Sequence, residues 1–339
     1  MAGTAVTRRL SRLEYGFAGP ADDAGLRALL RETPMDGSVR LTLEREPSFF
    51  GTAHVEGERH HTIYAREAGK IVAMASRNVH TLFVNGTPTR IGYLSQLRIA
   101  TSHRQHTRQF LRTGFAMLHE THAADEAPFD ITTIITDNSI ARRLLEAGLP
   151  NLPHYQFVDR ILTMLLPVGR GREQLPRAMS VSVPTGYPYQ FSSVVPPMSL
   201  PMVQVERQGR VVGSAIIWDQ RKFKQVVVRG YSRAMERWRW LLRLPAVGTA
   251  LPLVYLSHFA VPAHDPNVCV ELVDTGLAAA RAMGCRWLVL GLTARHPLAP
   301  VVQWRYRPRR YESRLYVVHE PGTRVQLDGR IPHVEVALL

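Results

Sequence analysis

A short basic segment of the chain combines residue types that bind anions. The stretch "HRQHTR" at residues 103–108 lies between an apolar, strand-like run and a helical pattern of apolar residues. Cations at a helix N-terminus oppose the helix dipole by about 0.3–1 kcal/mol each, so this crowding is unfavourable unless an anion binds there. The segment therefore predicts an anion-binding helix start that uses Arg104, His106 and Arg108, against the alternative of a solvated helix end.

Other side chains are candidates for proton transfer or for holding a water molecule. Glu46, in "LEREPSFF", would be a base if burial raised its pKa, although a salt bridge is the commoner role of such a residue. His258, in the strand-like run "VYLSHFAV", suits a general base or a buried structural histidine. Gln96 and Ser95 are neutral and poor bases, but they could hold a water molecule or the substrate.

The chain is strongly basic, with a formal net charge of +14. This charge favours an anionic partner, such as a phosphorylated co-substrate, a carrier protein, RNA or an acidic membrane surface, or else reflects a general preference for arginine. Arginines alternate with Trp and Tyr at residues 231–245 and 296–318. Such interleaving suits the phosphopantetheine of a carrier protein, an RNA backbone or anionic lipid, and equally Arg stacking at a domain interface.

Length and composition exclude several classes of protein. A chain of 339 residues with 45% hydrophobic residues predicts two globular domains with sizeable cores. Two cysteines, Cys269 and Cys285, are too few for a disulfide framework and favour the cytoplasm. We expect no membrane span, because Pro and His interrupt the longest apolar run, and no metal site, because no histidine pair has a nearby third ligand.

The first half predicts an alternation of strands and helices. We expect an entry strand at 15–17, a helix at 21–34 and a short helix with a loop at 36–54. Three strands follow between residues 60 and 99, joined by the hairpin turns "EAGK" and "VNGTP". The remaining predicted elements are a helix after residue 103, a strand at 130–136, a helix at 138–148 and a strand at 155–166.

The second half repeats this pattern. After a Pro-rich and Gly-rich linker at 168–195, the hairpin at 206–218 matches the hairpin at 66–77, and a strand, a helix and a second strand follow in the same order. The sequence therefore predicts a tandem duplication, with an N-terminal domain at 1–167 and a C-terminal domain at 196–339. Each is an α/β domain of the α+β kind, in which helices flank a central, mixed but mostly antiparallel sheet.

This order of elements resembles the Gcn5-related N-acetyltransferase (GNAT) superfamily in its tandem double-domain form. The first signature of that family, R/Q-x-x-G-x-G/A, aligns with Arg104, Gln105, His106, Thr107, Arg108 and Gln109, where Thr107 and Gln109 replace both glycines. The second signature is met by "NSIARRLLEAG", which supplies Asn138, Ala141 and Gly148. The second half keeps the order of elements without either signature.

The resemblance implies a binding site for acetyl-CoA or another acyl-CoA in the first half. The backbone of Leu97, Arg98 and Ile99 would face the pantetheine arm and the thioester, and the two signatures would hold the rest of the donor. Family members often carry a catalytic Tyr where this chain has Leu145. Tyr155, just beyond the helix, is the candidate to replace that tyrosine as the acid, unless it only packs at the start of a strand.

The function expected from the resemblance is acyl transfer from acyl-CoA, or from a thioester on a carrier protein, to an amine of a small molecule or peptide. The amine would attack the thioester directly, because neither cysteine is placed to form a covalent intermediate. Two alternatives stay open. One is an aminoacyl-tRNA-dependent transferase with duplicated GNAT-like domains, and the other is a GNAT-like binding protein that has lost its chemistry.

Overall fold

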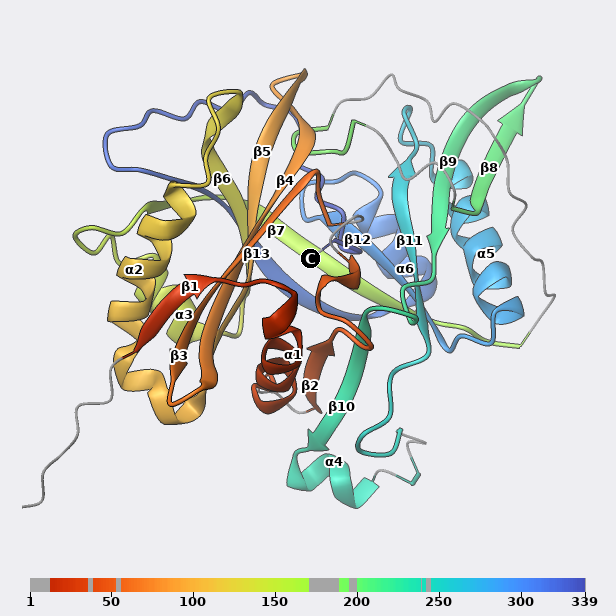
Figure 1. Cartoon of the computed structure of the whole chain (residues 1–339). Coiled ribbons are helices and arrows are strands. Elements are labelled where there is room, and N and C mark those ends of the chain that lie inside the picture. The colour runs from red at the N-terminus through yellow and green to blue at the C-terminus, as the bar shows by residue number, and fades with distance from the viewer. Residues whose placement is uncertain are drawn as a thin grey trace, which may run out of the picture.

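One continuous sheet of eleven strands runs through the molecule (Figure 1). The computed structural model describes residues 13–35, 39–52, 56–170, 189–194, 200–238, 240–241 and 245–338. The strand order in the sheet is β1-β3-β4-β5-β6-β13-β7-β12-β11-β9-β8, and β10 pairs separately with β2. Most neighbouring strands are antiparallel, and the parallel pairs β5–β6 and β11–β12 occupy corresponding places in the two halves.

The first half follows the predicted order with one correction. Its elements are β1 (Glu14–Phe17), α1 (Asp23–Glu32), β2 (Val39–Glu44), β3 (Arg59–Glu67), β4 (Lys70–Val84), β5 (Thr87–Ile99), α2 (Thr107–His119), β6 (Glu126–Ile135), α3 (Ser139–Leu145) and β7 (His154–Pro167). The short helix expected within 36–54 is wrong for residues 39–44, which form β2. Alternating Val, Leu and Leu on this segment let it pair with β10 (Gln225–Tyr231), which no local pattern reveals.

Both predicted hairpin turns are confirmed. Asn85 and Gly86 have φ of 51° and 82°, and Ala68 and Gly69 have φ of 47° and 80°. Such turns match the right-handed twist of the strands that they join, and glycine takes up positive φ without steric cost. The hairpins fix the register of β3, β4 and β5, and with it the position of the last strand, β5, from which the candidate site is built.

The second half contains the repeated elements. They are β8 (Met202–Arg207), β9 (Arg210–Trp218), β10, α4 (Arg233–Trp238), β11 (Leu253–Ala260), α5 (Pro266–Ala282), β12 (Trp287–Thr293), α6 (Ala299–Tyr306) and β13 (Arg309–His319). The β8–β9 turn again has positive φ at Gln208 and Gly209. The predicted duplication of hairpin, strand, helix and strand is therefore present in the structure. Most of the expected linker at 168–195 lies outside the described residues.

The two halves exchange their final strands. β13 belongs to the second half in sequence, yet it pairs with β6 of the first half, from Ser313 opposite Ile135 to His319 opposite Phe129. β7 belongs to the first half in sequence, yet it pairs with the whole length of β12, from Pro167 opposite Trp287 to Ile161 opposite Thr293. β7 and β13 also pair with each other. This exchange joins two half-sheets into one sheet and fixes the two halves relative to each other.

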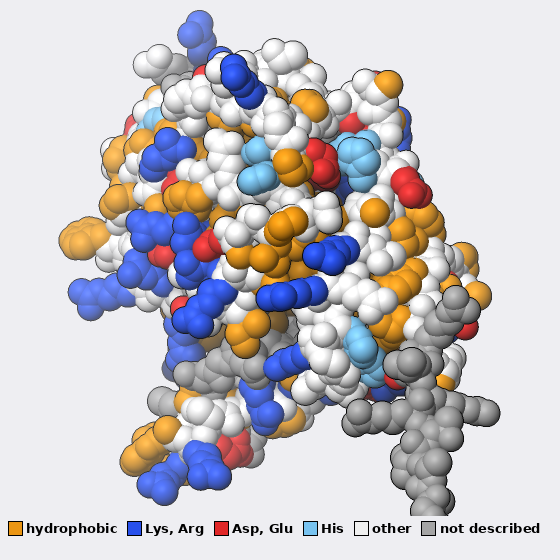
Figure 2. All heavy atoms as spheres, turned by 90° about the vertical axis from the view of Figure 1, so that its left-hand side faces the viewer, with side chains coloured by type: hydrophobic (Ala, Val, Ile, Leu, Met, Phe, Trp, Pro, Cys, Tyr) orange, Lys and Arg blue, Asp and Glu red, His pale blue; other side chains and the backbone are white. Residues whose placement is uncertain are grey.

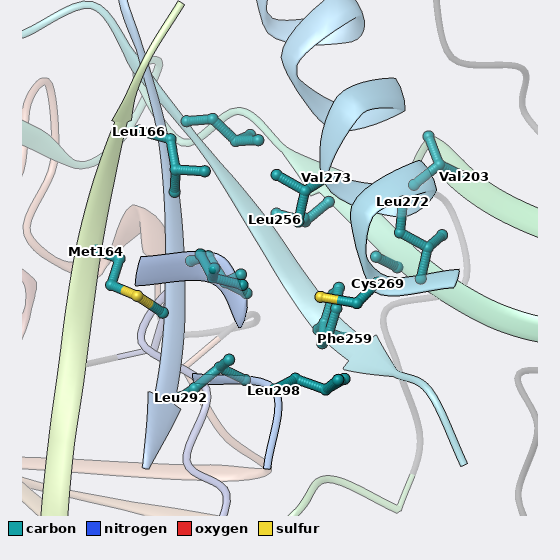
Figure 3. Close-up of a cluster of buried hydrophobic side chains, with 14 of the residues drawn as sticks. Met164, Leu166, Val203, Leu256, Phe259, Cys269, Leu272, Val273, Leu292 and Leu298 are labelled. Atoms are coloured by element: carbon teal, nitrogen blue, oxygen red, sulfur yellow. The ribbon is translucent and has the colours of Figure 1, made fainter. Parts of the chain in front are cut away.

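Three clusters of buried apolar side chains hold the layers together. One lies under α1, α2 and α3 in the first half, and a second lies under α5 and α6 in the second half. Met164 and Leu166 of β7 point into the second cluster, which also contains Leu256, Leu272 and Leu292 (Figure 3). A third cluster spans both halves on the opposite face of the sheet and includes Phe191 and Val336. The exchanged strands therefore carry core residues of both halves.

Candidate functional site

The site of the first half begins at a bulge in β5. The pairing of β5 with β4 shifts register between Ser76, which opposes Ser95, and Met74, which opposes Arg98, and Gln96 has a φ of 54°. A bulge of this kind leaves residues of one strand unpaired with the next strand. The buried oxygens Ser95 Oγ and Gln96 Oε1 have no hydrogen-bond partner, and Gln96 as a whole is only 8% exposed. A bound group that donates hydrogen bonds, such as a water molecule, would satisfy both oxygens.

The parallel strands β5 and β6 part at the same place. Their pairing ends where Leu94 opposes Thr132, and the Thr132 hydroxyl donates a hydrogen bond to the Leu94 carbonyl at 2.7 Å. Beyond that point β6 continues to Ile135 alongside β13, while β5 runs on through the bulge to Ile99. Leu97, Arg98 and Ile99 therefore lie on the part of β5 that has separated from β6. The Arg98 guanidinium donates to the Leu97 carbonyl at 2.9 Å.

The basic segment 103–108 follows directly and forms a helix start, as its position requires. A 3₁₀ turn at Thr101–His106 runs into α2, whose first turn holds no acidic residue and receives no side-chain cap. Thr107 donates its hydroxyl to the Arg104 carbonyl at 2.6 Å. Arg104, Gln105, Arg108 and Gln109 are exposed, and His106 and Thr107 are partly buried.

A recess of about 160 Å³ adjoins this helix start. Arg108 and Arg112 of α2 line one side of it, and Leu149, Pro150 and Leu152 of the α3–β7 connection line the other. The face that carries α2 and α3 shows many Lys and Arg side chains and fewer acidic ones (Figure 2). Arginine donors at a helix N-terminus provide the charge and the geometry that phosphate groups require.

The start and the end of α3 are explained by residues at its two termini. The Asn138 side chain accepts a hydrogen bond from the Ala141 amide at 3.1 Å and so caps α3, and Gly148 takes a φ of 59° just beyond the helix. Ala141 packs against the core of the first half. In the described contacts both signature residues position α3, and the connection that follows α3 lines one side of the recess.

The candidate proton-transfer residues have different surroundings. The Glu46 carboxylate pairs with Arg27 and Arg31, the salt-bridge arrangement that was the alternative to a basic role. The ring of Tyr155 packs against Phe115 and Tyr316, and burial raises the pKa of its hydroxyl, aided by the charge of Asp130. The structure does not bring Glu46 and Tyr155 together through any contact that it records between the two.

His258 lies at a second bulge that corresponds to the first. The segments "YLSQ" at 93–96 and "YLSH" at 255–258 end in the residues with positive φ, 54° for Gln96 and 49° for His258. The register of β11 on β9 shifts between Ser257 and Ala260, and the parallel pairing of β11 with β12 ends at Leu256. The second half therefore repeats both the bulge and the parting of the strands.

The second bulge is occupied by the chain itself. The His258 amide donates to the Glu335 carboxylate at 2.8 Å, and Thr293, at the end of β12, donates its hydroxyl to the Pro332 carbonyl at 2.9 Å. Gly291 of β12 leaves room for Val336, because a Cβ at residue 291 would collide with that side chain. Residues 331–338, which we call the tail, thus contact both strands where they part. No local pattern of residues indicates this role of Glu335.

A cluster of ionisable rings adjoins Glu335. The Tyr189 hydroxyl contacts His264 Nε2 at 2.9 Å, and His333 Nε2 lies 2.9 Å from Glu335 Oε1. Burial acts to raise the pKa of Glu335, but the charges of His258 and His333 and their hydrogen bonds outweigh it and lower the pKa to about 2. Burial, with the charges of His333 and His264, lowers the pKa of His296 to about 3. His258 also has a pKa lowered by burial.

The helix that follows the second bulge differs in charge from α2. At α5 the Asp265 carboxylate accepts a hydrogen bond from the Asn267 amide at 2.7 Å and so caps the helix. A carboxylate at this position already complements the helix dipole and repels a second anion. Of the two corresponding helix starts, the one in the first half is suited to a phosphate.

Comparisons with known proteins identify the fold. No protein-family profile and no curated protein matches the chain. Among solved structures, the Saccharomyces cerevisiae N-myristoyltransferase with bound myristoyl-CoA is similar over 96% of this chain and 84% of that chain, with a TM-score of 0.57 and 13% identity. The GCN5-related N-acetyltransferase from Sphaerobacter thermophilus is similar over 93% of this chain and 98% of that chain, with a TM-score of 0.50 and 11% identity.

A third similar structure supports the double form. It is a tandem GNAT protein from the clavulanic acid biosynthesis pathway, matched over 93% of this chain and all 100% of that chain, with a TM-score of 0.50 and 10% identity. The chain therefore has the GNAT fold in its tandem form, and the predicted fold class is confirmed. No helix within the described residues is both long and apolar enough to cross a membrane.

Proposed function

We propose that the chain is an N-acyltransferase that moves an acyl group from an acyl-CoA thioester to an amine, with the donor bound in the first half. One comparison within the molecule carries this proposal. Two equivalent bulges lie where parallel strands part, and the second is filled by Glu335 of the tail, while the first leaves Ser95 Oγ and Gln96 Oε1 buried without partners. A polar ligand at the first bulge would take the place that Glu335 occupies at the second.

The filled bulge indicates how the donor would lie in the first one. The His258 amide donates to a carboxylate oxygen, and the equivalent amide in the first half belongs to Gln96. We place the thioester oxygen within reach of that amide. A backbone donor aimed at the oxygen that becomes negative during acyl transfer typically contributes about 10²- to 10³-fold in rate. The pantetheine arm would run along Leu97, Arg98 and Ile99.

The phosphates of the donor would lie at the start of α2. Arg104 and Arg108 are exposed there with no acidic neighbour in the first helical turn, and Arg112 lines the adjoining recess. Each charge-assisted hydrogen bond contributes about 1.5–3 kcal/mol. Thr107 and Gln109, which replace glycines of the family signature, make the turn bulkier, so these arginines replace part of the backbone contact.

The proton steps follow from the chemistry of the reaction. The amine nitrogen attacks the thioester carbon, loses a proton, and expels the thiolate of CoA, which takes up a proton. We assign Ser95 and Gln96 to holding a water molecule that accepts the first proton, and Tyr155 to supplying the second. The raised pKa of Tyr155 keeps its hydroxyl protonated at neutral pH. The acceptor is proposed to be an amine of a small molecule or a peptide.

Ligand titration tests the donor site. Acyl-CoA at about 100 times its dissociation constant should stabilise the chain by about 2.7 kcal/mol, measured as a thermal shift. Arg104→Ala with Arg108→Ala should remove most of that shift, while Arg210→Ala, an exposed arginine on the β8–β9 hairpin, should leave it unchanged. If neither free CoA nor acetyl-, octanoyl- or myristoyl-CoA shifts the melting temperature, the donor assignment is wrong.

Turnover then separates catalysis from binding. Release of free thiol from bound acyl-CoA, measured against a panel of amines and short peptides, is expected to require the amine. Binding without thiol release for any amine would favour a GNAT-like binding protein. Co-purifying RNA, with no affinity for CoA, would favour a transferase that uses aminoacyl-tRNA.

A further inference from the structure

The hairpin that follows β10 projects from the body of the molecule. β10 pairs with β2 on one side, and residues 246–251 return along its other side, with the Val228 amide donating to the Thr249 carbonyl at 3.1 Å and the Gly248 amide to the Val228 carbonyl at 2.7 Å. The Tyr231 hydroxyl donates to the Pro245 carbonyl at 2.7 Å and closes the base. α4 lies at the end of this hairpin, at the bottom of Figure 1. The hairpin therefore presents its tip on a supported base.

The tip carries large apolar side chains in water. Trp238 is 53% exposed, Trp240 78%, Leu241 56% and Val247 54%. Tryptophan and leucine at this exposure are uncommon on the surface of a folded chain, and contiguous exposed apolar residues mark interaction sites. The hydrophobic and basic side chains lie together at the lowest described part of the molecule in Figure 2. The tip can therefore bind a partner through apolar contacts.

The tip is also positively charged. Residues 231–250 contain four arginines and a single acidic residue, Glu236. Arg233 and Arg237 of α4 are exposed beside the tryptophans. We call Arg233, Arg237, Trp238, Trp240, Leu241 and Val247 the α4 patch. Basic residues that flank exposed Trp and Leu are the composition of segments that lie in a membrane interface.

We propose that the α4 patch docks the protein on a bilayer that contains anionic phospholipid. Trp238, Trp240 and Leu241 would enter the boundary between headgroups and acyl chains, and Arg233 and Arg237 would contact lipid phosphates. A flat bilayer can meet a projecting convex tip, whereas nucleic acid is usually held in a groove. Leu241 and Val247 also offer no stacking surface to a base, so the patch fits lipid better than RNA. This proposal is independent of the acyl-transfer function.

Vesicle co-sedimentation of the full chain tests the proposal. The chain should partition onto vesicles made of equal parts of phosphatidylcholine and phosphatidylglycerol, and much less onto phosphatidylcholine alone. Partitioning should weaken as salt rises, because salt screens the arginines. Arg233→Ala with Arg237→Ala should weaken it about 30-fold, since each arginine near an anionic surface is worth about fivefold. Trp238→Ala with Trp240→Ala should weaken it about tenfold or more.

A matched control uses the same residue types elsewhere. Trp304 of α6 is 82% exposed beside Arg305, so Trp304→Ala with Arg305→Ala removes an equally exposed pair outside the patch. This variant should bind vesicles like the parent chain. The proposal is overturned by equal losses in control and patch variants, by unchanged binding in the patch variants, or by equal partitioning onto both kinds of vesicle. Patch variants that lose binding to single-stranded RNA but keep binding to vesicles would also overturn it.

Discussion

Near Glu335, whose pKa is lowered to about 2, burial lowers the pKa of two histidines, His258 and His296. His296 is 1% exposed, its Nδ1 accepts a hydrogen bond from the Leu298 amide at 3.1 Å, and its Nε2 has no partner. Tyr189, His264 and His333 surround it, so a proton on His296 would meet two further imidazoles. The folded chain therefore binds a proton at His296 only at a pH far below neutral.

The stability of the chain should fall as the pH drops from 7 to 5. His296 has a folded pKa of about 3 against an ordinary value of 6.5, so the unfolded chain takes up a proton below about pH 6.5 that the folded chain refuses. This group alone should cost about 2 kcal/mol over that interval. His296→Asn, which keeps an acceptor for the Leu298 amide, should flatten the dependence by that amount in urea unfolding. Glu335 has a pKa of about 2, so its protonation lowers the stability of the folded chain only at a still lower pH.

An equal pH dependence in the parent and the variant would show that His296 is protonated in the folded chain. The exposed histidine His119, changed to Asn, is the matched control and should leave the dependence as in the parent.

At the scale of elements, the pairing of β5 with β6 sets where the strands part. Gly92 of β5 packs against a buried ion-pair network in which Arg77 lies 2.9 Å from Asp130 and 2.5 Å from Glu126. A Cβ at residue 92 would lie 2.6 Å from Arg77 Nε and would collide with the Asp130 carboxylate. Glycine is needed here because the two strands and the network approach so closely.

Gly92→Ala should therefore destabilise the chain by about 2–4 kcal/mol, because the buried ion pairs must move or break. Gly169→Ala is the control, since nothing lies within 4 Å of a Cβ at that position. The difference in urea midpoint between the two variants measures the effect. A Gly92→Ala chain as stable as the control would mean that the network moves without cost.

Much of this element structure could be predicted from local patterns. Asn85–Gly86 and Gly69 indicated both hairpins, and Asn138 indicated the start of α3. The likeness of "YLSQ" and "YLSH" indicated that the two strands correspond, but the bulges in them are visible only in the structure. Residues 39–44 could not be assigned, because their strand exists through β10, which lies far away in sequence. The contact of Glu335 with His258 depends on the complete fold, so the residues next to either of them in sequence do not predict it.

At the scale of the whole molecule, the exchange of β7 and β13 makes each half depend on the other. Leu162, Met164 and Leu166 of β7 belong to the core of the second half, and Tyr316 and Val318 of β13 belong to the core of the first. A half without its exchanged strand would expose an unpaired sheet edge and open its core. The domain limits at 167 and 196 thus stay a prediction about sequence repeats, and independent folding of the two repeats is not implied.

The full chain should unfold in one cooperative step, with circular dichroism and tryptophan fluorescence giving the same urea midpoint. Residues 1–167 and 168–339 produced separately should each fail to give a cooperative transition, and they should regain one when they are mixed or coexpressed. Two separate transitions in the full chain, or a cooperative transition in either isolated half, would contradict this expectation.

The exchange of strands also sets the order of events while the chain is being synthesised. β6 of the first half receives its neighbour β13 only after nearly the whole second half has been translated. Until then its edge offers unpaired amides and carbonyls to any extended segment, including one on another ribosome. Pairing over such a long sequence separation is slow. A cell that makes this protein should therefore need more chaperone capacity the longer it takes to translate residues 136–308.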